Sequence, residues 1–182
     1  MVETISILQD GNCLFRSIAS SINNDLFNAK RYVSGRIIDN KFLIIEKELS
    51  KSLRFLVINY LIRNKQRYIN EKIGGCSKFL DVKETFHKHL SRMKNDGEFG
   101  EFLEITGISD MLNVNINIYM KKEDEPYLIF STSNGKENIH LLLVDNHYDI
   151  LKRSPKKKND INLNPKLRRS VRIRELNKIN KF

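Results

Sequence analysis

The sequence predicts an α+β domain, because its helical and strand patterns occupy separate parts of the chain. Apolar residues recur at helical spacing from residue 12 to about residue 113, and strand-like runs follow from residue 114 to residue 151. Helices that precede a sheet are typical of this fold class. The dense apolar patterning ends at Leu151. We therefore expect one domain over residues 1–151 and a separate segment over residues 152–182.

Five helices are expected where apolar residues recur three and four positions apart. The first begins at Asn12, because Asp10 and Gly11 favour a turn and asparagine is a good N-cap. In the third, a single apolar stripe indicates one buried face. The expected helices span residues 12–21, 28–38, 51–67, 82–93 and 98–113.

Four strands are expected after the helices, at residues 114–120, 127–132, 139–144 and 147–151. Asn134-Gly135 is a typical hairpin turn, and we place it between the second and third of these strands. Asp145-Asn146 forms a turn-like pair between the last two. Residues 5–8 are interpreted as a short strand or as a lead-in to the first helix. Together these segments predict an antiparallel sheet.

Cys13 is the candidate nucleophile of the chain. It follows Asp10-Gly11-Asn12 at the start of the first helix, where unpaired backbone N–H groups favour a thiolate. The backbone N–H groups of Gly11, Asn12 and Cys13 are candidates for stabilising an oxyanion. A small buried hydrophobe is the ordinary role of a lone cysteine, and this is our interpretation of Cys76.

A histidine far downstream supplies the base that such a nucleophile needs. His147 and Asp149 fall on the same face of an alternating strand. An acceptor two residues after a histidine can fix one tautomer of the imidazole and stabilise its charged form. Asp145 and Asn146, in the preceding turn, are alternative orienting groups. The chain thus contains a candidate nucleophile, base and orienting group.

Four segments, in the right order, resemble motifs of the ovarian-tumour (OTU) family of cysteine deubiquitinases. Residues 10–19 (DGNCLFRSIA) resemble its nucleophile motif, and residues 147–149 (HYD) resemble its histidine motif. Residues 53–61 are similar to its helix of the form L-R-x-x-x-x-x-Y-[IL], and residues 99–104 to its W-G-x-x-x-E segment. The resemblance covers roughly residues 5–151. Phe99 replaces the usual tryptophan, which we interpret as a change in packing.

The resemblance implies an OTU-like fold, with helices packed around a small, mainly antiparallel sheet. It implies a deubiquitinase that cleaves peptide or isopeptide bonds after the C-terminal glycine of ubiquitin or a ubiquitin-like protein, with single ubiquitin or polyubiquitin chains as partners. In this scheme Cys13 is the nucleophile, His147 is the base, Asp149 orients His147, and Asp10 supports the catalytic turn. No cofactor and no metal are needed.

Composition excludes several other classes of protein. Two cysteines support neither a disulfide framework nor a zinc site of four thiolates, and no apolar run approaches the ~20 residues of a membrane span. The first residues lack the pattern of a secretory signal. We expect a monomer in the reducing interior of a cell, cytoplasmic or nuclear. His87, His89 and His140 are interpreted as ordinary side chains, the first two on a charged helix.

The net charge of the chain is concentrated beyond the predicted domain. Residues 152–182 hold twelve basic and two acidic residues, which account for the whole formal charge of +10. The domain itself is therefore not a basic nucleic-acid binder. The segment has too few apolar residues to offset its ordering entropy, so we expect it to be flexible. Nucleic acid or an import receptor are its candidate partners.

Two other functions stay open from the sequence alone. The domain could bind ubiquitin without catalysis, although the intact cysteine and histidine motifs favour an enzyme. Alternatively, the basic segment could carry the function by attaching the chain to nucleic acid or chromatin, with the domain as a scaffold.

Overall fold

The described part of the chain folds into helices, one five-stranded sheet and one two-stranded sheet. The computed structural model describes residues 3–28, 40–69, 85–122 and 125–152, and the backbone alone of residues 32–33 and 36–37. Most helices precede the strands of the large sheet, which confirms the α+β prediction. Cys76 and residues 153–182 lie outside the described residues.

The elements follow one another in a simple order. The helices are α1 (Cys13–Ile22), α2 (Asn24–Asn28), α3 (Asn40–Arg63), α4 (Lys65–Ile69), α5 (Phe86–Met93) and α6 (Phe102–Leu112). The strands are β1 (Glu3–Ile5), β2 (Tyr32–Val33), β3 (Arg36–Ile37), β4 (Val114–Lys122), β5 (Glu125–Ser131), β6 (Glu137–Val144) and β7 (His147–Lys152). The large sheet has the order β1-β7-β6-β4-β5, and β2 pairs with β3. Within the large sheet all neighbours are antiparallel except β4 and β6, which run parallel.

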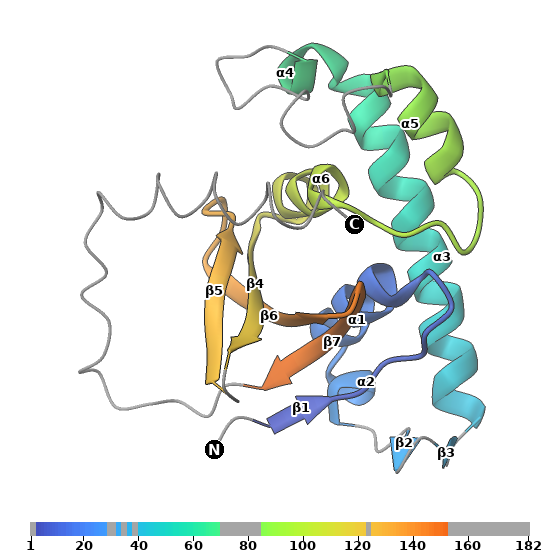
Figure 1. The fold of residues 1–182 in the computed structure, drawn as a ribbon. Coiled ribbons are helices and arrows are strands. Elements are labelled where there is room, and N and C mark those ends of the chain that lie inside the picture. The colour runs from blue at the N-terminus through green and yellow to red at the C-terminus, as the bar shows by residue number, and fades with distance from the viewer. Residues whose placement is uncertain are drawn as a thin grey trace.

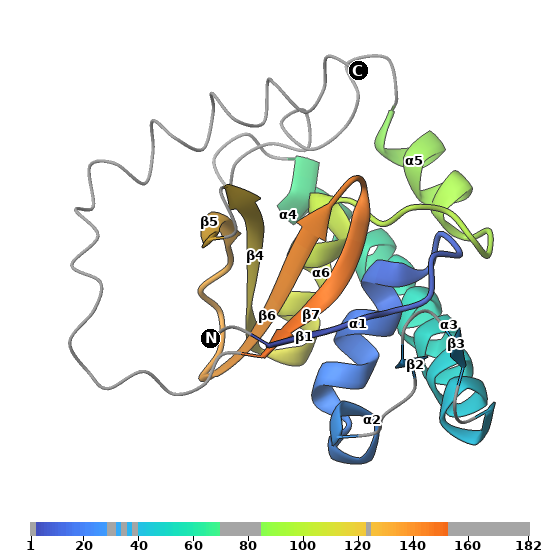
Figure 2. The same ribbon diagram turned by 60° about the horizontal axis from the view of Figure 1, so that its bottom comes forward.

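Helices cover one face of the large sheet in two layers. α1 packs on β6 and β7, α6 packs on β4, and α3 lies across α1 and α6. Figures 1 and 2 show α3 as the long helix on the side away from the sheet. The core lies between these layers and includes Leu14, Ile18, Val57, Ile108 and Leu141. This packing brings the N-terminus of α1 beside β7.

The first helix and the last four strands confirm the sequence prediction closely. α1 and β4 to β7 begin and end within two residues of the expected positions. β1 ends at Ile5, so residues 6–8 are the lead-in to the turn before α1. α5 begins at Phe86, and residues 82–84 of the predicted helix lie outside the described residues.

The predicted helix over residues 28–38 is wrong. The short helix α2 precedes this range, and the antiparallel pair β2–β3 lies within it. The sequence there combines Tyr32 and Val33, which favour strands, with Ser34-Gly35, which favours a turn. These preferences outweigh the helical spacing of the apolar residues.

The third helix is longer at its start and shorter at its end than predicted. α3 begins at Asn40 instead of residue 51 and ends at Arg63, after which α4 is a separate helix. The first half of α3 has no clear apolar stripe, because Ile44 is 62% exposed while the nearby Glu46 is fully buried. A charged residue that faces the core therefore conceals this half of the helix from pattern analysis.

The predicted start of the last helix is four residues too early, because a capping box sets the helix boundary. α6 begins at Phe102, whereas the prediction began at residue 98. The Glu101 side chain accepts a bond from the backbone of the third helical residue, and Glu101 N donates to Glu104 Oε2 at 2.9 Å. This reciprocal pair satisfies N–H groups at the first turn and ends the preceding extended segment.

One of the two predicted turns is confirmed and the other is wrong. Asp145 and Asn146 have φ values of 48° and 58° and join β6 to β7, as a two-residue hairpin turn requires. Asn134-Gly135 does not join a hairpin, because β6 pairs with β4 and not with β5. Gly135 N instead donates to Asn115 Oδ1 at 2.9 Å, and Asn115 Nδ2 donates to Gly135 O at 2.7 Å. These bonds tie the connection to the start of β4.

A buried ion network joins α1, α3 and the turn before α1. Arg16 is 2% exposed, and its Nη1 donates to Glu46 Oε1 at 3.2 Å. Ser20 Oγ donates to the other oxygen of Glu46 at 3.2 Å. The opposite side of the Arg16 guanidinium contacts Asp10, with a shortest distance of 2.6 Å. Because an unpaired buried charge costs several kcal/mol, this network holds the three segments in a fixed arrangement.

We expect Glu46→Gln to lower the free energy of unfolding by about 2–3 kcal/mol, because Arg16 then loses one of its two charged partners in the interior. Glu48→Gln is the matched control on the same helix. The Glu48 side chain is 68% exposed and lies 3.9 Å from Lys51 Nζ, so its loss should change stability by less than about 0.5 kcal/mol. Urea unfolding of both variants measures the difference. Equal stability of the two would contradict the assignment.

Candidate active site

A tight turn at Asp10-Gly11-Asn12 directly precedes Cys13. Asp10 Oδ1 accepts a hydrogen bond from Asn12 N at 3.0 Å, which closes the turn, and Gly11 adopts a φ of +75°. A Cβ atom on Gly11 would lie 1.7 Å from the backbone oxygen of Gly97. Only glycine therefore fits here, both for its conformation and for the closeness of the second segment. Cys13 follows as the first residue of α1 and is 2% exposed.

The expectation that Asn12 caps α1 through its side chain is wrong. Asn12 occupies the N-cap position, but its side chain makes no capping bond. Its Oδ1 accepts instead from Arg54 Nη2 at 2.8 Å and from Gly97 N at 3.3 Å. A charged donor from α3 makes a stronger bond than a neutral backbone N–H, so the tertiary contact replaces the local one. Asn12 thus links the catalytic turn to two distant segments.

Asp10 anchors the turn as an ionised carboxylate. Burial alone would raise the pKa of this carboxyl group. The hydrogen bonds and charge of Arg16, with the N–H of Asn12, outweigh burial and lower the pKa below its usual value. Because the pKa is lowered on folding, this contribution to stability is present at neutral pH and is lost as the pH falls through the folded value. Asp10 is suited to fixing the turn and not to moving protons.

His147 and Asp149 meet on one face of β7. His147 Nε2 lies 3.0 Å from Asp149 Oδ1, and the two side chains are 11% and 21% exposed. The same carboxylate oxygen accepts from Ile7 N at 2.9 Å, so the lead-in after β1 holds Asp149 in place. The alternative orienting groups, Asp145 and Asn146, are exposed turn residues. The bond through Nε2 leaves Nδ1 as the ring nitrogen available for a second partner.

Packing of α1 on β7 places Cys13 beside the backbone of Tyr148, the residue after His147. Ser17 Oγ donates to Tyr148 O at 2.9 Å, which joins the first turns of α1 to the residue after His147. The Tyr148 backbone is close enough to Cys13 to lower the pKa of its thiol by hydrogen bonding. The structure therefore brings the Cys13 turn close to the strand that carries His147 and Asp149.

The expected lowering of the Cys13 pKa by the helix N-terminus is not found. Burial of the side chain raises the pKa of the thiol above its ordinary value, and the charge of Asp10 adds to the increase. Backbone N–H groups of Tyr148, Leu14 and Cys13 oppose this increase but do not outweigh it. The helix N-terminus is present, as expected, but desolvation is the larger effect. A nucleophile in this state needs a base that removes its proton during attack.

Two of the three expected oxyanion donors are available in the turn. Asn12 N already donates to Asp10 Oδ1, so this N–H group is engaged. Within the described part of the chain, the backbone N–H groups of Gly11 and Cys13 donate to no other residue. Both lie on the turn that ends at the thiol, where an oxyanion would form.

The chain matches a family model described as OTU-like cysteine protease over residues 8–142. It belongs to this family. The OTU chain is also 27% identical, over 140 residues, to the protein 232R of Invertebrate iridescent virus 3, which is named as a ubiquitin thioesterase. This match covers 76% of the chain but only 14% of the length of that relative.

Solved structures of OTU domains share the fold. The OTUD1 OTU domain is 21% identical, with a TM-score of 0.54 and coverage of 84% of this chain and 86% of that chain. The viral OTU protease from Taggert virus is 18% identical, with a TM-score of 0.56 and coverage of 86% and 82%. The Hazara virus OTU, solved bound to ubiquitin, is 20% identical, with a TM-score of 0.51 and coverage of 83% and 80%.

Phe99 fills the position of the usual OTU tryptophan by stacking on Tyr148. The two rings are 5.4 Å apart and inclined by 18°. Tyr148 is 1% exposed and lies between His147 and Asp149 in sequence. The smaller aromatic ring therefore still supports the strand that carries the proposed base.

His89 differs from the sequence expectation of an ordinary residue on a charged helix. Its side chain is fully buried, and its Nε2 lies 2.8 Å from Glu104 Oε1, which is also fully buried. Arg92 Nη2 lies 3.2 Å from the other ring nitrogen. This pair joins α5 to α6. Periodicity on a short, charged helix gave no signal for it, whereas His87 is exposed as expected.

Neither a metal centre nor a membrane span is found among the residues that the structure describes. In this part of the chain no group of three or more His, Cys, Asp or Glu side chains is arranged to hold a metal ion. None of the described helices combines the length and hydropathy needed to cross a bilayer.

We expect the resting thiol of Cys13 to titrate above its ordinary value of 9.0, because burial disfavours the thiolate. The measurement is the rate of alkylation by iodoacetamide against pH, in a Cys76→Ser variant with a single thiol. The same protein unfolded in urea is the control and should return to the ordinary midpoint. A folded midpoint at or below the unfolded one would contradict the effect of burial.

Proposed function

We propose that the chain is a cysteine deubiquitinase that hydrolyses the bond after the C-terminal glycine of ubiquitin or a ubiquitin-like protein. The observation that carries this proposal is the packing of Cys13, at the N-terminus of α1, against the Tyr148 backbone, which lies between His147 and Asp149 on β7. Membership of the OTU-like family supports it. The name of the viral relative and the ubiquitin complex of the Hazara virus OTU support ubiquitin as the substrate class.

The first half of the reaction transfers the acyl group to sulfur. Cys13 Sγ attacks the carbonyl carbon of the terminal glycine while its proton passes to His147 Nδ1. The N–H groups of Gly11 and Cys13 donate to the oxyanion of the tetrahedral intermediate. Collapse breaks the C–N bond, and the proton on His147 passes to the leaving amine. A thioester between Cys13 and the substrate remains.

The second half of the reaction restores the enzyme. Water attacks the thioester carbonyl and gives a proton to His147. The C–S bond then breaks, the substrate leaves as a carboxylic acid, and the proton returns to Cys13. Because burial raises the pKa of the Cys13 thiol, the first step needs His147 as a general base that takes this proton during attack.

Asp149 has the role of fixing the tautomer of His147. Its Oδ1 lies 3.0 Å from Nε2, so the proton of the neutral imidazole is held there and the lone pair stays on Nδ1. When His147 gains the second proton, the same carboxylate stabilises the charge. The bond from Ile7 N keeps Asp149 oriented in both states.

We expect the wild-type protein to form a covalent adduct with ubiquitin that carries a C-terminal thiol-reactive group, and Cys13→Ala to form none. Asp149→Ala should still react, but with kcat on a fluorogenic ubiquitin amide reduced about 10²–10⁴-fold, because His147 loses its orientation. Asp145→Ala, in the adjoining turn, is the control and should keep its activity. A folded wild type that forms no adduct would favour a silent ubiquitin-binding module or another substrate.

The basic segment favours a second, compatible function. We propose that residues 152–182 attach the chain to nucleic acid or to an import receptor, and that the enzyme acts as a monomer in a reducing cellular compartment. All of the excess charge of the chain lies in this segment, so the domain of residues 1–151 has no net positive charge to attract phosphates.

Binding to double-stranded DNA should depend on the segment and weaken steeply with salt, because Lys and Arg release counterions from phosphates. Replacing Lys156, Lys157 and Lys158 by serine should reduce the slope of log affinity against log salt by about 3 if all three contact phosphates. Fluorescence anisotropy measures this change, and a chain that ends at Leu151 should lose binding. Equal binding by that shortened chain would contradict the proposal.

A further inference from the structure

Arg54 of α3 connects the catalytic turn to the segment between α5 and α6. Its side chain is 4% exposed. Nη2 donates to Asn12 Oδ1 at 2.8 Å and to Gly11 O at 3.4 Å, both in the turn. The same nitrogen donates to Glu98 O, and Nη1 donates to Met93 O at 3.2 Å. One guanidinium therefore binds both segments at once.

The geometry of these bonds requires the planar fork of arginine. The guanidinium carbon lies 4.1 Å from the centroid of the Phe15 ring, so the plane of the group is held by stacking. Arg54 Nε is buried and has no hydrogen-bond partner in the described part of the chain. Both terminal nitrogens of Arg54 thus donate to backbone and side-chain oxygens, while Nε donates to none of the described residues. Lysine has a single, unbranched donor group and cannot reach all of these acceptors.

The two segments that Arg54 joins also touch each other. Gly97 N donates to Asn12 Oδ1 at 3.3 Å, and the Gly97 carbonyl leaves no room for a side chain on Gly11. Asp10 and Arg16 hold the beginning of the turn, whereas Arg54 and Gly97 hold its middle. Loss of Arg54 would therefore free the middle of the turn without breaking its first anchor.

We propose that Arg54 is a positioning residue that holds the N–H groups of Gly11 and Cys13 where the oxyanion of the reaction forms. This inference rests on the proposed function, because it concerns the same acyl transfer. Arg54 touches neither the substrate nor the thiol in this scheme. It acts by clamping the turn, through Asn12, to the segment that follows α5.

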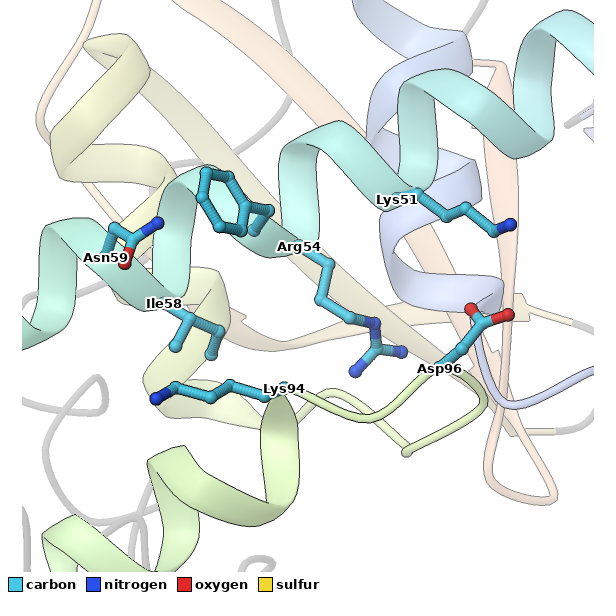
Figure 3. Close-up of a pocket in the computed structure, with 7 residues that line it drawn as sticks. Lys51, Arg54, Ile58, Asn59, Lys94 and Asp96 are labelled. Carbon is cyan, nitrogen blue, oxygen red and sulfur yellow. The ribbon is translucent and has the colours of Figure 1, made fainter.

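A cavity lies beside Arg54. The cavity has a volume of about 560 Å³ and is lined by Arg54, Lys94 and Asp96, among others. Figure 3 shows Arg54 extending from α3 toward the segment that carries Lys94 and Asp96. Water in this cavity can replace the lost bonds to the Met93 and Glu98 carbonyls. Arg54→Lys should then fold, with its turn less firmly held.

The test compares Arg54→Lys with Arg63→Lys, an exposed arginine at the end of the same helix. On ubiquitin with a C-terminal fluorogenic amide, we expect kcat of Arg54→Lys to fall about 10–100-fold with KM changed less than about twofold. Alkylation of Cys13 by iodoacetamide should keep its rate, because this reaction forms no oxyanion. Arg63→Lys should match the wild type. Unchanged kcat, or a parallel loss of alkylation, would overturn the proposal.

A second readout does not need a substrate. Hydrogen exchange of the Asn12 and Gly97 amides should be at least about tenfold faster in Arg54→Lys, while the core amide of Ile116 is unchanged. If the wild type cleaves no ubiquitin amide, the proposed function fails, and this exchange still decides whether Arg54 clamps the turn. If Arg54→Lys does not fold, Asn12→Ala removes the other end of the bond and should show the same loss of kcat. A normal kcat in Asn12→Ala would contradict the proposal that Arg54 positions the turn through Asn12.

Discussion

The buried charge of Arg16 is the constraint on which the rest of the structure depends. Its guanidinium lies inside the domain and is stable there only because Asp10 and Glu46 reach it from two directions. An unpaired charge in this position would cost several kcal/mol, so the turn, α1 and α3 take up one relative arrangement. The position of Cys13, three residues before Arg16, follows from that arrangement. The same buried contacts of Arg16 therefore stabilise the core and fix the position of Cys13.

The candidate site combines a buried thiol with a histidine that is held in one orientation. Burial raises the pKa of the Cys13 thiol, while Asp149 and the backbone of Ile7 hold His147 in place. A thiol in this state reacts poorly with adventitious electrophiles and becomes a nucleophile when the carbonyl and the base are both in place. The turn before Cys13 is held by contacts outside the candidate site. These come from Glu46 and Arg54 in α3 and from Gly97 after α5.

Prediction from the sequence succeeded where local signals were strong and failed where they were not. α1, β4 to β7 and the turn at Asp145-Asn146 follow from periodicity and turn preferences, which act over a few residues. The parallel pairing of β6 with β4, and hence the error at Asn134-Gly135, depends on which strands meet in space. The first half of α3 was not predicted because Glu46 is buried and Ile44 is exposed, which reverses the usual pattern of apolar residues inside and charged residues outside.

The sequence by itself determined the fold class and the family, and it singled out the four candidate side chains Asp10, Cys13, His147 and Asp149. Each stands in a short motif whose residue types are informative without neighbours. The tertiary structure alone decided the raised pKa of Cys13, the partner of the Asn12 side chain and the engagement of the Asn12 N–H group by Asp10. Desolvation and long-range hydrogen bonds exist only after distant segments pack together. A local sequence pattern therefore cannot predict these effects.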